Sequence, residues 1–196
     1  MDSIKKNELI AFAAGVLLGS FMTFQFLSAQ NSTDHQHYDE YHVHADFLIY
    51  IQDEKIDLEK EIYMTTSEQE LHEHAHLHDA NGEVQHMHKE GITFAEFINS
   101  LGLNVTDECI TYDGTEYCSS EEESLLLFVN NEQYEGSITN FEAMDEDRVL
   151  LYYGPYDEEK ITGYMNEVKN DACFYSGTCP ERGIAPPESC GLTCEI

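Results

Sequence analysis

The chain has 196 residues, with 39 Asp and Glu against nine Lys and Arg, and a formal net charge of −30. This acidity excludes nucleic acid and anionic lipid surfaces as partners, because the attraction to phosphate that drives such binding would be reversed. The acids are scattered among apolar residues, which is typical of a folded domain with an acidic surface rather than of a disordered chain. Screening by high salt, as in a halophilic setting, would reduce the self-repulsion of this surface.

An apolar run without charged residues extends from Leu9 to Leu27, after Lys5 and Lys6. Its 19 residues would reach about 29 Å as a helix, close to the hydrocarbon thickness of a bilayer. We therefore expect a single-pass cell-membrane protein whose C-terminal domain is extracellular. Cleavage near Ser28-Ala29 is the alternative. The expected segments are a cytoplasmic N-terminus (1–8), a transmembrane signal anchor (9–29), a polar linker (30–40), a His-rich ectodomain (41–158), and a helix with a Cys-rich tail (159–196).

Eight of the ten histidines occur in runs where every second residue is His. The first run lies on a predicted strand over Tyr41–Ile51, in which His42, His44 and Asp46 share one face. The opposite face of that strand is apolar and is expected to pack in the core. A turn and a short partner strand over Ile56–Leu58 follow. His35 and His37 fall in the predicted linker and are weaker ligand candidates.

The second and third histidine runs flank a predicted hairpin turn between Asp79 and Glu83. A two-residue Asn81-Gly82 loop would leave the two runs on opposite faces. A three-residue loop over 80–82, with Gly82 in the left-handed conformation, sets His76 opposite His86 and gathers the histidines on one face. We favour the three-residue loop. It pairs His74 with His88 and His78 with Val84.

The rest of the chain predicts an α+β fold with a mainly antiparallel sheet. Thr93 and Glu96 form a capping box before a short amphipathic helix that Gly102 can end. Strands are expected over 124–129, 133–135 and 148–153, and a second helix over 161–170. A hairpin, a helix and returning strands around one core resemble a β-grasp arrangement.

All six cysteines follow the apolar run, as in proteins of oxidising compartments. An Asp113-Gly114 turn places Cys109 directly opposite Cys118 in a hairpin, so we predict that these two form a disulfide. The last four, Cys173, Cys179, Cys190 and Cys194, leave three pairings open. No Cys-x-x-Cys occurs, which argues against thioredoxin-type catalysis. Asn31 and Asn104 begin N-glycosylation sequons, as in a glycoprotein.

Several of these segments together resemble a group of mostly uncharacterised extracytoplasmic archaeal and bacterial proteins. They are Tyr41-His-Val-His-Ala-Asp-Phe, His76-Leu-His-Asp79, Gly82-Glu-Val-Gln-His86-Met-His88 and Thr93-Phe-Ala-Glu-Phe-Ile98. The similarity covers residues 41–102, and archaeal members extend it through Tyr153 and the Cys-rich tail. The resemblance singles out His42, His44, His76, His78 and His86 as matching positions.

The histidine pattern predicts a metal site on one sheet face, for copper or zinc, because both accept imidazole nitrogen. A loosely chelating surface and an absence of any metal role are the alternatives. A metal-dependent redox or hydrolytic enzyme, a thiol–disulfide related protein and a structural acidic surface protein remain as other functions. A homo-oligomer or another surface protein is a further expected partner. The candidate ligands are His42, His44, His72, His74, His76, His78, His86, His88 and Asp46.

Overall fold

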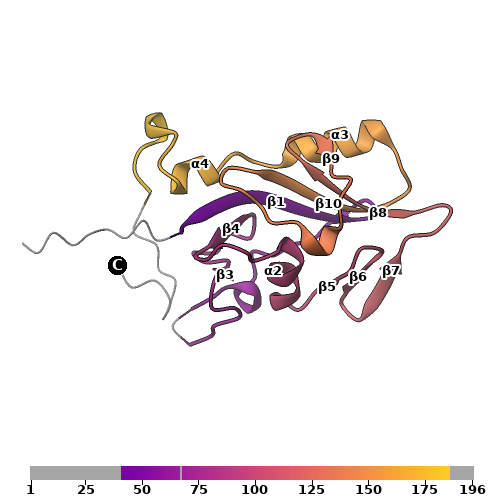
Figure 1. Ribbon diagram of the computed structural model, residues 1–196, viewed down its shortest axis with the longest axis horizontal. Helices are drawn as coiled ribbons and strands as arrows, with labels where there is room; N and C mark the ends of the chain where they lie inside the picture. The colour runs from indigo at the N-terminus through magenta and orange to yellow at the C-terminus, as the bar shows by residue number, and fades with distance from the viewer. Residues whose placement is uncertain (1–40, 67, 186–196) are drawn as a thin grey trace, which may run out of the picture. The chain divides into compact units, whose positions relative to one another are not determined.

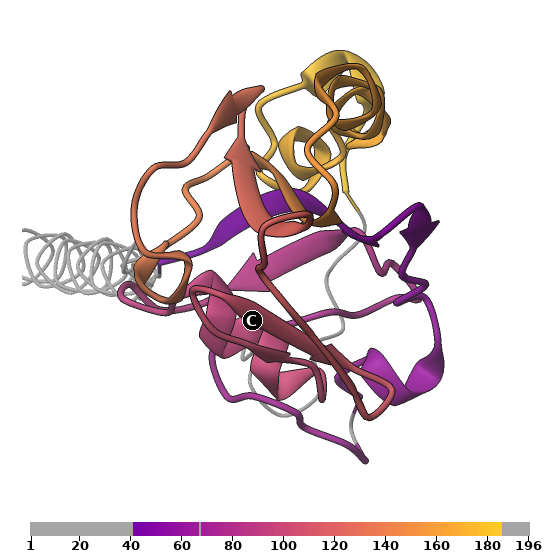
Figure 2. The ribbon, with the colours of Figure 1, turned by 90° about the vertical axis from the view of Figure 1, so that its right-hand side faces the viewer.

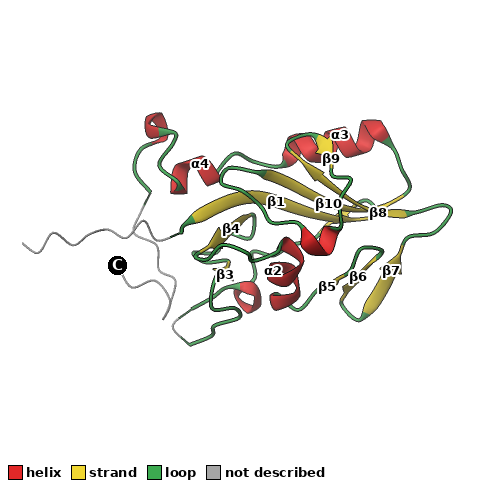
Figure 3. Ribbon diagram, in the orientation of Figure 1, coloured by secondary structure: helices red, strands yellow, loops and turns green. Residues whose placement is uncertain are grey.

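The computed structural model describes residues 41–66 and 68–185 of the chain (Figure 1). The predicted N-terminus, signal anchor and linker lie outside these residues, as do His35, His37, Asn31, Cys190 and Cys194. No helix among the described residues is long and apolar enough to cross a bilayer. The described part is an α+β fold built on mainly antiparallel sheets, as predicted (Figure 3).

The main sheet has the strand order β3-β4-β1-β10-β8-β9. Its centre is a parallel pair that sequence reasoning did not foresee, in which Asp46 of β1 lies opposite Arg148 of β10. The other pairs of this sheet are antiparallel. Its strands are β1 (Val43–Ile51), β2 (Glu54–Lys55), β3 (Ala75–His76), β4 (Val84–Met87), β8 (Ser124–Val129), β9 (Glu132–Gln133) and β10 (Arg148–Gly154).

Strand β1 is buried on both faces, because helices cover the sheet from both sides (Figure 2). Its odd-numbered side chains, such as Phe47 and Ile49, enter the larger core together with helix α2 (Phe94–Ser100). On the other face, Leu48 and Tyr50 pack with helix α3 (Glu158–Glu167). His44 and Asp46 share that second face, nearer the start of the strand. The predicted alternation of side chains along β1 is therefore present, but the face that carries His44 is buried in the protein and not exposed to solvent.

The helix boundaries follow the capping residues. Helix α2 begins after Thr93, whose side chain accepts a hydrogen bond from the backbone N of Glu96 at 3.1 Å, as predicted. Helix α3 begins three residues earlier than predicted, because the carboxylate of Asp157 accepts from the backbone N of Lys160 at 3.1 Å. A third helix, α4 (Ala172–Tyr175), had no sequence signal.

The remaining strands form a separate three-stranded sheet. They are β5 (Asn104–Val105), β6 (Cys109–Tyr112) and β7 (Thr115–Cys118). The predicted hairpin register is confirmed, with Cys109 opposite Cys118, and the two are joined by a disulfide. A second disulfide joins Cys173 to Cys179, which selects one of the pairings left open. The partner strand predicted over Ile56–Leu58 lies earlier in the chain: β2 starts two residues after Gln52, whose φ of 56° turns the chain tightly.

The hairpin between β3 and β4 has the predicted pairing, with His76 opposite His86 and Ala75 opposite Met87. The predicted conformation of its loop is wrong. The left-handed residues are Asp79 and Ala80, with φ of 54° and 57°, and not Gly82. Gly82 serves another purpose: a Cβ there would lie 2.6 Å from the backbone N of Glu59 and 2.7 Å from the carbonyl oxygen of Leu58. The loop therefore needs glycine for close backbone approach.

Glu83 fixes the far side of this loop. Its nearly buried carboxylate forms ion pairs with Lys55 and, at 2.8 Å, with Lys169. Burial alone raises the pKa of Glu83, but the hydrogen bonds and charges of Lys169 and Lys55 outweigh it and hold the pKa below its ordinary 4.5. The loop is thereby tied to β2 and to the segment after α3.

The Gly82→Ala variant should be destabilised by about 1–3 kcal/mol, because the added methyl group forces the loop away from Leu58 and Glu59. Gly163 of α3 is the control, since a Cβ there meets nothing within 4 Å. Gly163→Ala should leave stability unchanged or raise it by up to about 1 kcal/mol. Urea denaturation measures both variants. Equal stability of the two would contradict the packing account.

Glu83→Gln should remove a pH-dependent part of the stability. A carboxylate whose pKa is lowered by folding stabilises the protein above its unfolded pKa, and this stabilisation is lost as pH falls through the folded pKa. The free-energy difference between wild type and Glu83→Gln should thus be constant near neutral pH and shrink below about pH 4.5. Urea titrations across the acid range test this. A difference that is the same at pH 3 and pH 7 would exclude the linkage.

Candidate metal centre

Six histidines converge on one face of the main sheet. They lie on or beside the three adjacent strands β1, β4 and β3. In the register of these strands, His44 of β1 is opposite His86 of β4, and His86 is opposite His76 of β3. The two-residue period of a strand then brings a second histidine from each strand to the same face. We call this set the histidine cluster: His42, His44, His76, His78, His86 and His88.

The rings of the cluster form a continuous network. The centroid of His86 lies 3.8 Å from that of His78 and 4.6 Å from that of His44. His42 lies 4.6 Å from His44 and 4.5 Å from His88. His88 in turn lies 5.0 Å from His76. Each imidazole is therefore within contact distance of at least one other.

The cluster has an inner part and a rim. His44, His76, His78 and His86 are only 0–1% exposed. His42 is exposed and His88 is half-buried, and both lie at the same end of the β1–β4 pair. These four imidazoles are therefore interior groups, which need hydrogen-bonding partners to offset the cost of their burial.

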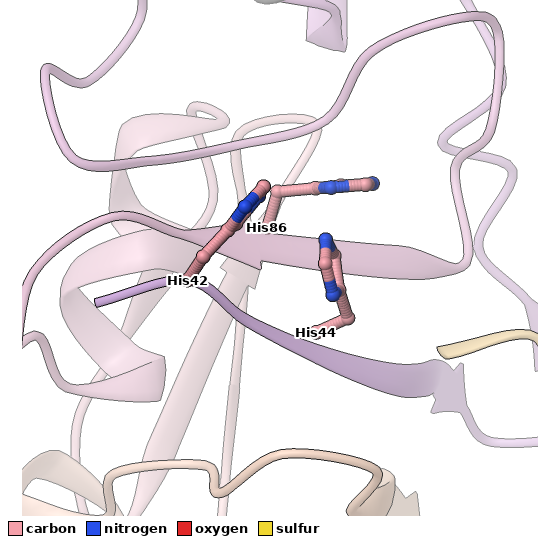
Figure 4. A group of neighbouring side chains, drawn as sticks. All are labelled: His42, His44 and His86. Carbon is pink, nitrogen blue, oxygen red and sulfur yellow. The ribbon is translucent and has the colours of Figure 1, made fainter. Parts of the chain in front are cut away.

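Three members of the cluster form a group that can hold a metal ion. One ring nitrogen from each of His42, His44 and His86 lies within 4.8 Å of the other two. Figure 4 shows the three side chains around a common space. Zinc–imidazole bonds of about 2.0–2.1 Å place tetrahedral ligands about 3.3 Å apart. Rotation of the exposed His42 side chain is a simple way to close the remaining distance.

A hydrogen-bond chain fixes the tautomer of His44. Ser176 donates to the carboxylate of Asp145 at 2.6 Å, and its oxygen lies 2.8 Å from Nδ1 of His44. Since the hydroxyl proton is directed at Asp145, the Ser176 oxygen accepts from His44, and Nδ1 carries the proton. Nε2 is then the nitrogen of His44 that is suited to bind a metal.

A second chain orients His86. Asp79 accepts from Nδ1 of His78 at 2.8 Å, because a carboxylate can only accept. In the neutral ring of His78, Nε2 is then the acceptor, and Nδ1 of His86 donates to it at 3.0 Å. His86 thereby also presents Nε2 as its unprotonated nitrogen. Both chains end in a carboxylate, the usual outer partner of metal-binding imidazole.

Asp46 shares the face of His44 but serves the backbone. Its two carboxylate oxygens accept from the backbone N of Asp171 and of Ala172, at 2.8 and 2.9 Å. Burial raises the pKa of Asp46 above its ordinary value, against the opposing effect of these two hydrogen bonds. Asp46 therefore holds the start of α4 over the sheet.

His72 and His74 have surroundings of their own. Nδ1 of His72 accepts from the backbone N of His74 and of Ala75, both at 3.1 Å, and its Nε2 lies 3.4 Å from Glu96. Nε2 of His74 lies 3.6 Å from Glu73. The structure therefore brings six of the eight predicted histidines together and places these two beside carboxylates outside the cluster.

Sequence reasoning missed the residues that cover the cluster. Tyr175 of α4 places its ring 5.1 Å from that of His86 and 5.7 Å from that of His44. Its hydroxyl accepts from Asn81 of the β3–β4 loop at 3.2 Å. Ser176 follows it, and Asp145 also accepts from the backbone N of His44 at 3.0 Å. These residues lie about a hundred positions or more from their histidines, so no local pattern could have revealed them.

Asp46→Ala should lower the free energy of unfolding of the metal-free protein by about 2–4 kcal/mol, because a buried and a part-buried backbone N–H group both lose their charged acceptor. Asp53→Ala is the control, since Asp53 is an exposed carboxylate paired with Lys160. It should cost only a small fraction of that. Thermal and urea unfolding measure the effect. Wild-type stability in Asp46→Ala would show that these hydrogen bonds do not hold α4.

Comparisons with protein-family models, with curated proteins and with solved structures return no match for this chain. The functional interpretation therefore rests on the geometry of the histidine cluster and on the chemistry of its residues.

Proposed function

We propose that this protein binds a divalent transition-metal ion, copper or zinc, through His42, His44 and His86. The observation that carries the proposal is the convergence of three imidazole nitrogens within 4.8 Å, in a cluster of six histidines. The two carboxylate-terminated hydrogen-bond chains support it, because they engage Nδ1 of His44 and Nδ1 of His86, which makes Nε2 the candidate ligand atom of each ring.

The donor set favours copper(II) or zinc over other ions. Imidazole nitrogen suits both, whereas calcium and magnesium require oxygen ligands. None of the described cysteines is a free thiol, so thiolate is absent from the described donor set. The remaining cluster members support the first three: the ring of His88 lies against that of His42, and the ring of His78 lies against that of His86.

We further propose that the protein is anchored in the cell membrane with this domain outside. The apolar run Leu9–Leu27 supports the anchor, and two disulfides support an oxidising compartment. The resemblance to extracytoplasmic archaeal and bacterial His-rich proteins points the same way. Partners such as a second copy of the chain or another surface protein belong to this proposal as well.

The finer fold assignment is also a proposal, namely a β-grasp-like domain. The strand order β4-β1-β10-β8 supports it, with the first and last strands parallel at the centre. Helix α2 follows β4, the antiparallel neighbour of β1, and precedes β8 and β10 in the chain, as that topology requires. In such a sheet, the face opposite α2 is left for α3, α4 and the histidines.

A metal-dependent hydrolytic enzyme is the second candidate. Three histidines that leave a coordination position open are also the ligand set of some catalytic zinc sites. Such a site requires a general base beside the ion. The nearby carboxylates have other partners: Asp79 binds His78, Asp145 binds Ser176, and Glu83 is held by two lysines. Metal binding is therefore the function that the geometry supports best.

The full-length protein, dialysed against Zn²⁺ or Cu²⁺, should retain a near-integral number of ions per chain by elemental analysis. His44→Gln and His86→Gln should each weaken binding by more than the 10- to 100-fold typical of an outer-shell residue, because each removes a ligand. His72→Gln and His74→Gln are matched controls and should bind like wild type. Substoichiometric metal that dilute imidazole removes from wild type would refute a specific site.

A further inference from the structure

We infer that the Cys173–Cys179 disulfide is energetically coupled to ion binding, with Ser176 as the positioning residue that connects them. The inference rests on the proposed metal-binding function and concerns its regulation. The disulfide and the histidine cluster belong to distant parts of the sequence, yet α4 brings the loop closed by the disulfide onto the cluster.

The coupling begins with what the disulfide encloses. The bond joins residues six positions apart, and Tyr175 and Ser176 lie between them. These are the residues that reach the cluster: Tyr175 contacts His44 and His86, and Ser176 binds Nδ1 of His44. The second disulfide, Cys109–Cys118, closes a hairpin of the separate three-stranded sheet.

The covering segment, residues 170–182, has anchors at both ends. At its start, Asp46 accepts from the backbone N of Asp171 and of Ala172. At its end, Arg182 donates to the carboxylate of Asp171 at 2.6 Å and to the carbonyl of Asn170. These contacts hold the ends of the segment but none of them reaches Ser176.

Between these anchors, the disulfide is the covalent constraint, and it acts beside the hydrogen bonds of Tyr175 to Asn81 and of Ser176 to Asp145. Helix α4 has only four residues, which is too short to persist without external support. Within the loop, the carbonyl of Cys173 accepts from the backbone N of Thr178 at 3.0 Å. Without the covalent closure, the loop that carries Tyr175 and Ser176 gains conformational freedom, and the oxygen of Ser176 no longer faces His44 in one geometry.

The consequence for the ion follows from the role of Ser176. Its oxygen accepts from Nδ1 of His44, which leaves Nε2 as the unprotonated nitrogen. When the Ser176–His44 hydrogen bond is lost, His44 also adopts the other tautomer and other ring orientations. The ion then binds more weakly, because only a fraction of the molecules have His44 in the tautomer and orientation that bind it. Reduction of the disulfide should therefore weaken ion binding. The converse must also hold, because thermodynamic coupling is reciprocal: a bound ion makes the disulfide harder to reduce.

The chemical step is a two-electron reduction. A dithiol reductant supplies two electrons and two protons, the Cys173–Cys179 bond breaks, two thiols form, and the reductant becomes a disulfide. For the experiment, a phosphine replaces the dithiol, because thiols would compete for the ion. The phosphine takes its oxygen from water to give the phosphine oxide, and water also supplies the two protons.

The first test concerns Ser176. Zn²⁺ affinity of the full-length protein is measured by competition with a chelating indicator for wild type, Ser176→Ala and Ser176→Thr. Ser176→Ala should bind about 10- to 100-fold more weakly, as for other outer-shell partners of metal-binding histidine. Ser176→Thr keeps the hydroxyl and should recover most of the affinity. Unchanged affinity in Ser176→Ala, or equal losses in both variants, would overturn the positioning role.

The second test compares the two disulfides. The double variant Cys173→Ser/Cys179→Ser should bind Zn²⁺ at least tenfold more weakly than wild type, and Cys109→Ser/Cys118→Ser should bind within about twofold of it. In wild type, Zn²⁺ should slow the exposure of the Cys173 and Cys179 thiols at a fixed phosphine concentration, as read over time by alkylation and mass spectrometry. Equal affinities in both double variants, with wild type still binding an ion, would overturn the coupling alone. A wild type that binds no Zn²⁺ or Cu²⁺ would instead overturn the proposed function.

Discussion

The histidine cluster depends on the loop between β3 and β4 having an odd number of residues, because this number decides which face the β4 histidines take. The loop after His78 places His76 opposite His86, and β1 then places His44 on the other side of His86. A slip of one residue would turn the β4 histidines to the opposite face, among Phe47, Leu77 and Met87 in the core. The two left-handed residues Asp79 and Ala80, and the close passage of Gly82 over Leu58, hold this parity.

Burial of imidazole requires partners, and the protein supplies them as hydrogen-bond chains that end in carboxylates. Asp79 accepts a hydrogen bond from His78, which in turn binds His86. Asp145 accepts from Ser176, which in turn binds His44. Both hydrogen-bond chains engage Nδ1, of His44 in one case and of His86 in the other, so that Nε2 is the acceptor nitrogen of each ring. The acidic surface complements this arrangement, because a net charge of −30 raises the local concentration of cations around the site.

The covering segment, residues 170–182, contacts the histidine cluster directly. The first half of the His-bearing face of β1 is covered by α4, and the second half by α3 (Figure 1). Asp46 connects the histidines with the C-terminal helices that pack on this face, since it lies two residues from His44 and holds the start of α4. A cysteine-rich tail can thus set the geometry of a site that contains no cysteine.

Local features of the fold were predictable from the sequence, because their causes are local. The Thr93 cap, the Asp113-Gly114 turn with its disulfide, and the alternation along β1 each depend on neighbouring residues. Pairing of His76 with His86 was also predictable, because it depends only on the length and position of the loop between the two strands. The α+β class followed from the order of these elements.

The tertiary structure alone decided which histidines meet and what covers them. His72 and His74 have the same spacing as the others, but they leave the cluster for Glu96 and Glu73. The parallel pairing of β1 with β10, and the contacts of Ser176 and Tyr175 with His44, join positions more than a hundred residues apart. The sequence by itself determined the chemistry of the donors and the face on which they lie. Their selection needed the folded chain, because contacts across such separations depend on how whole elements pack rather than on the spacing of residues.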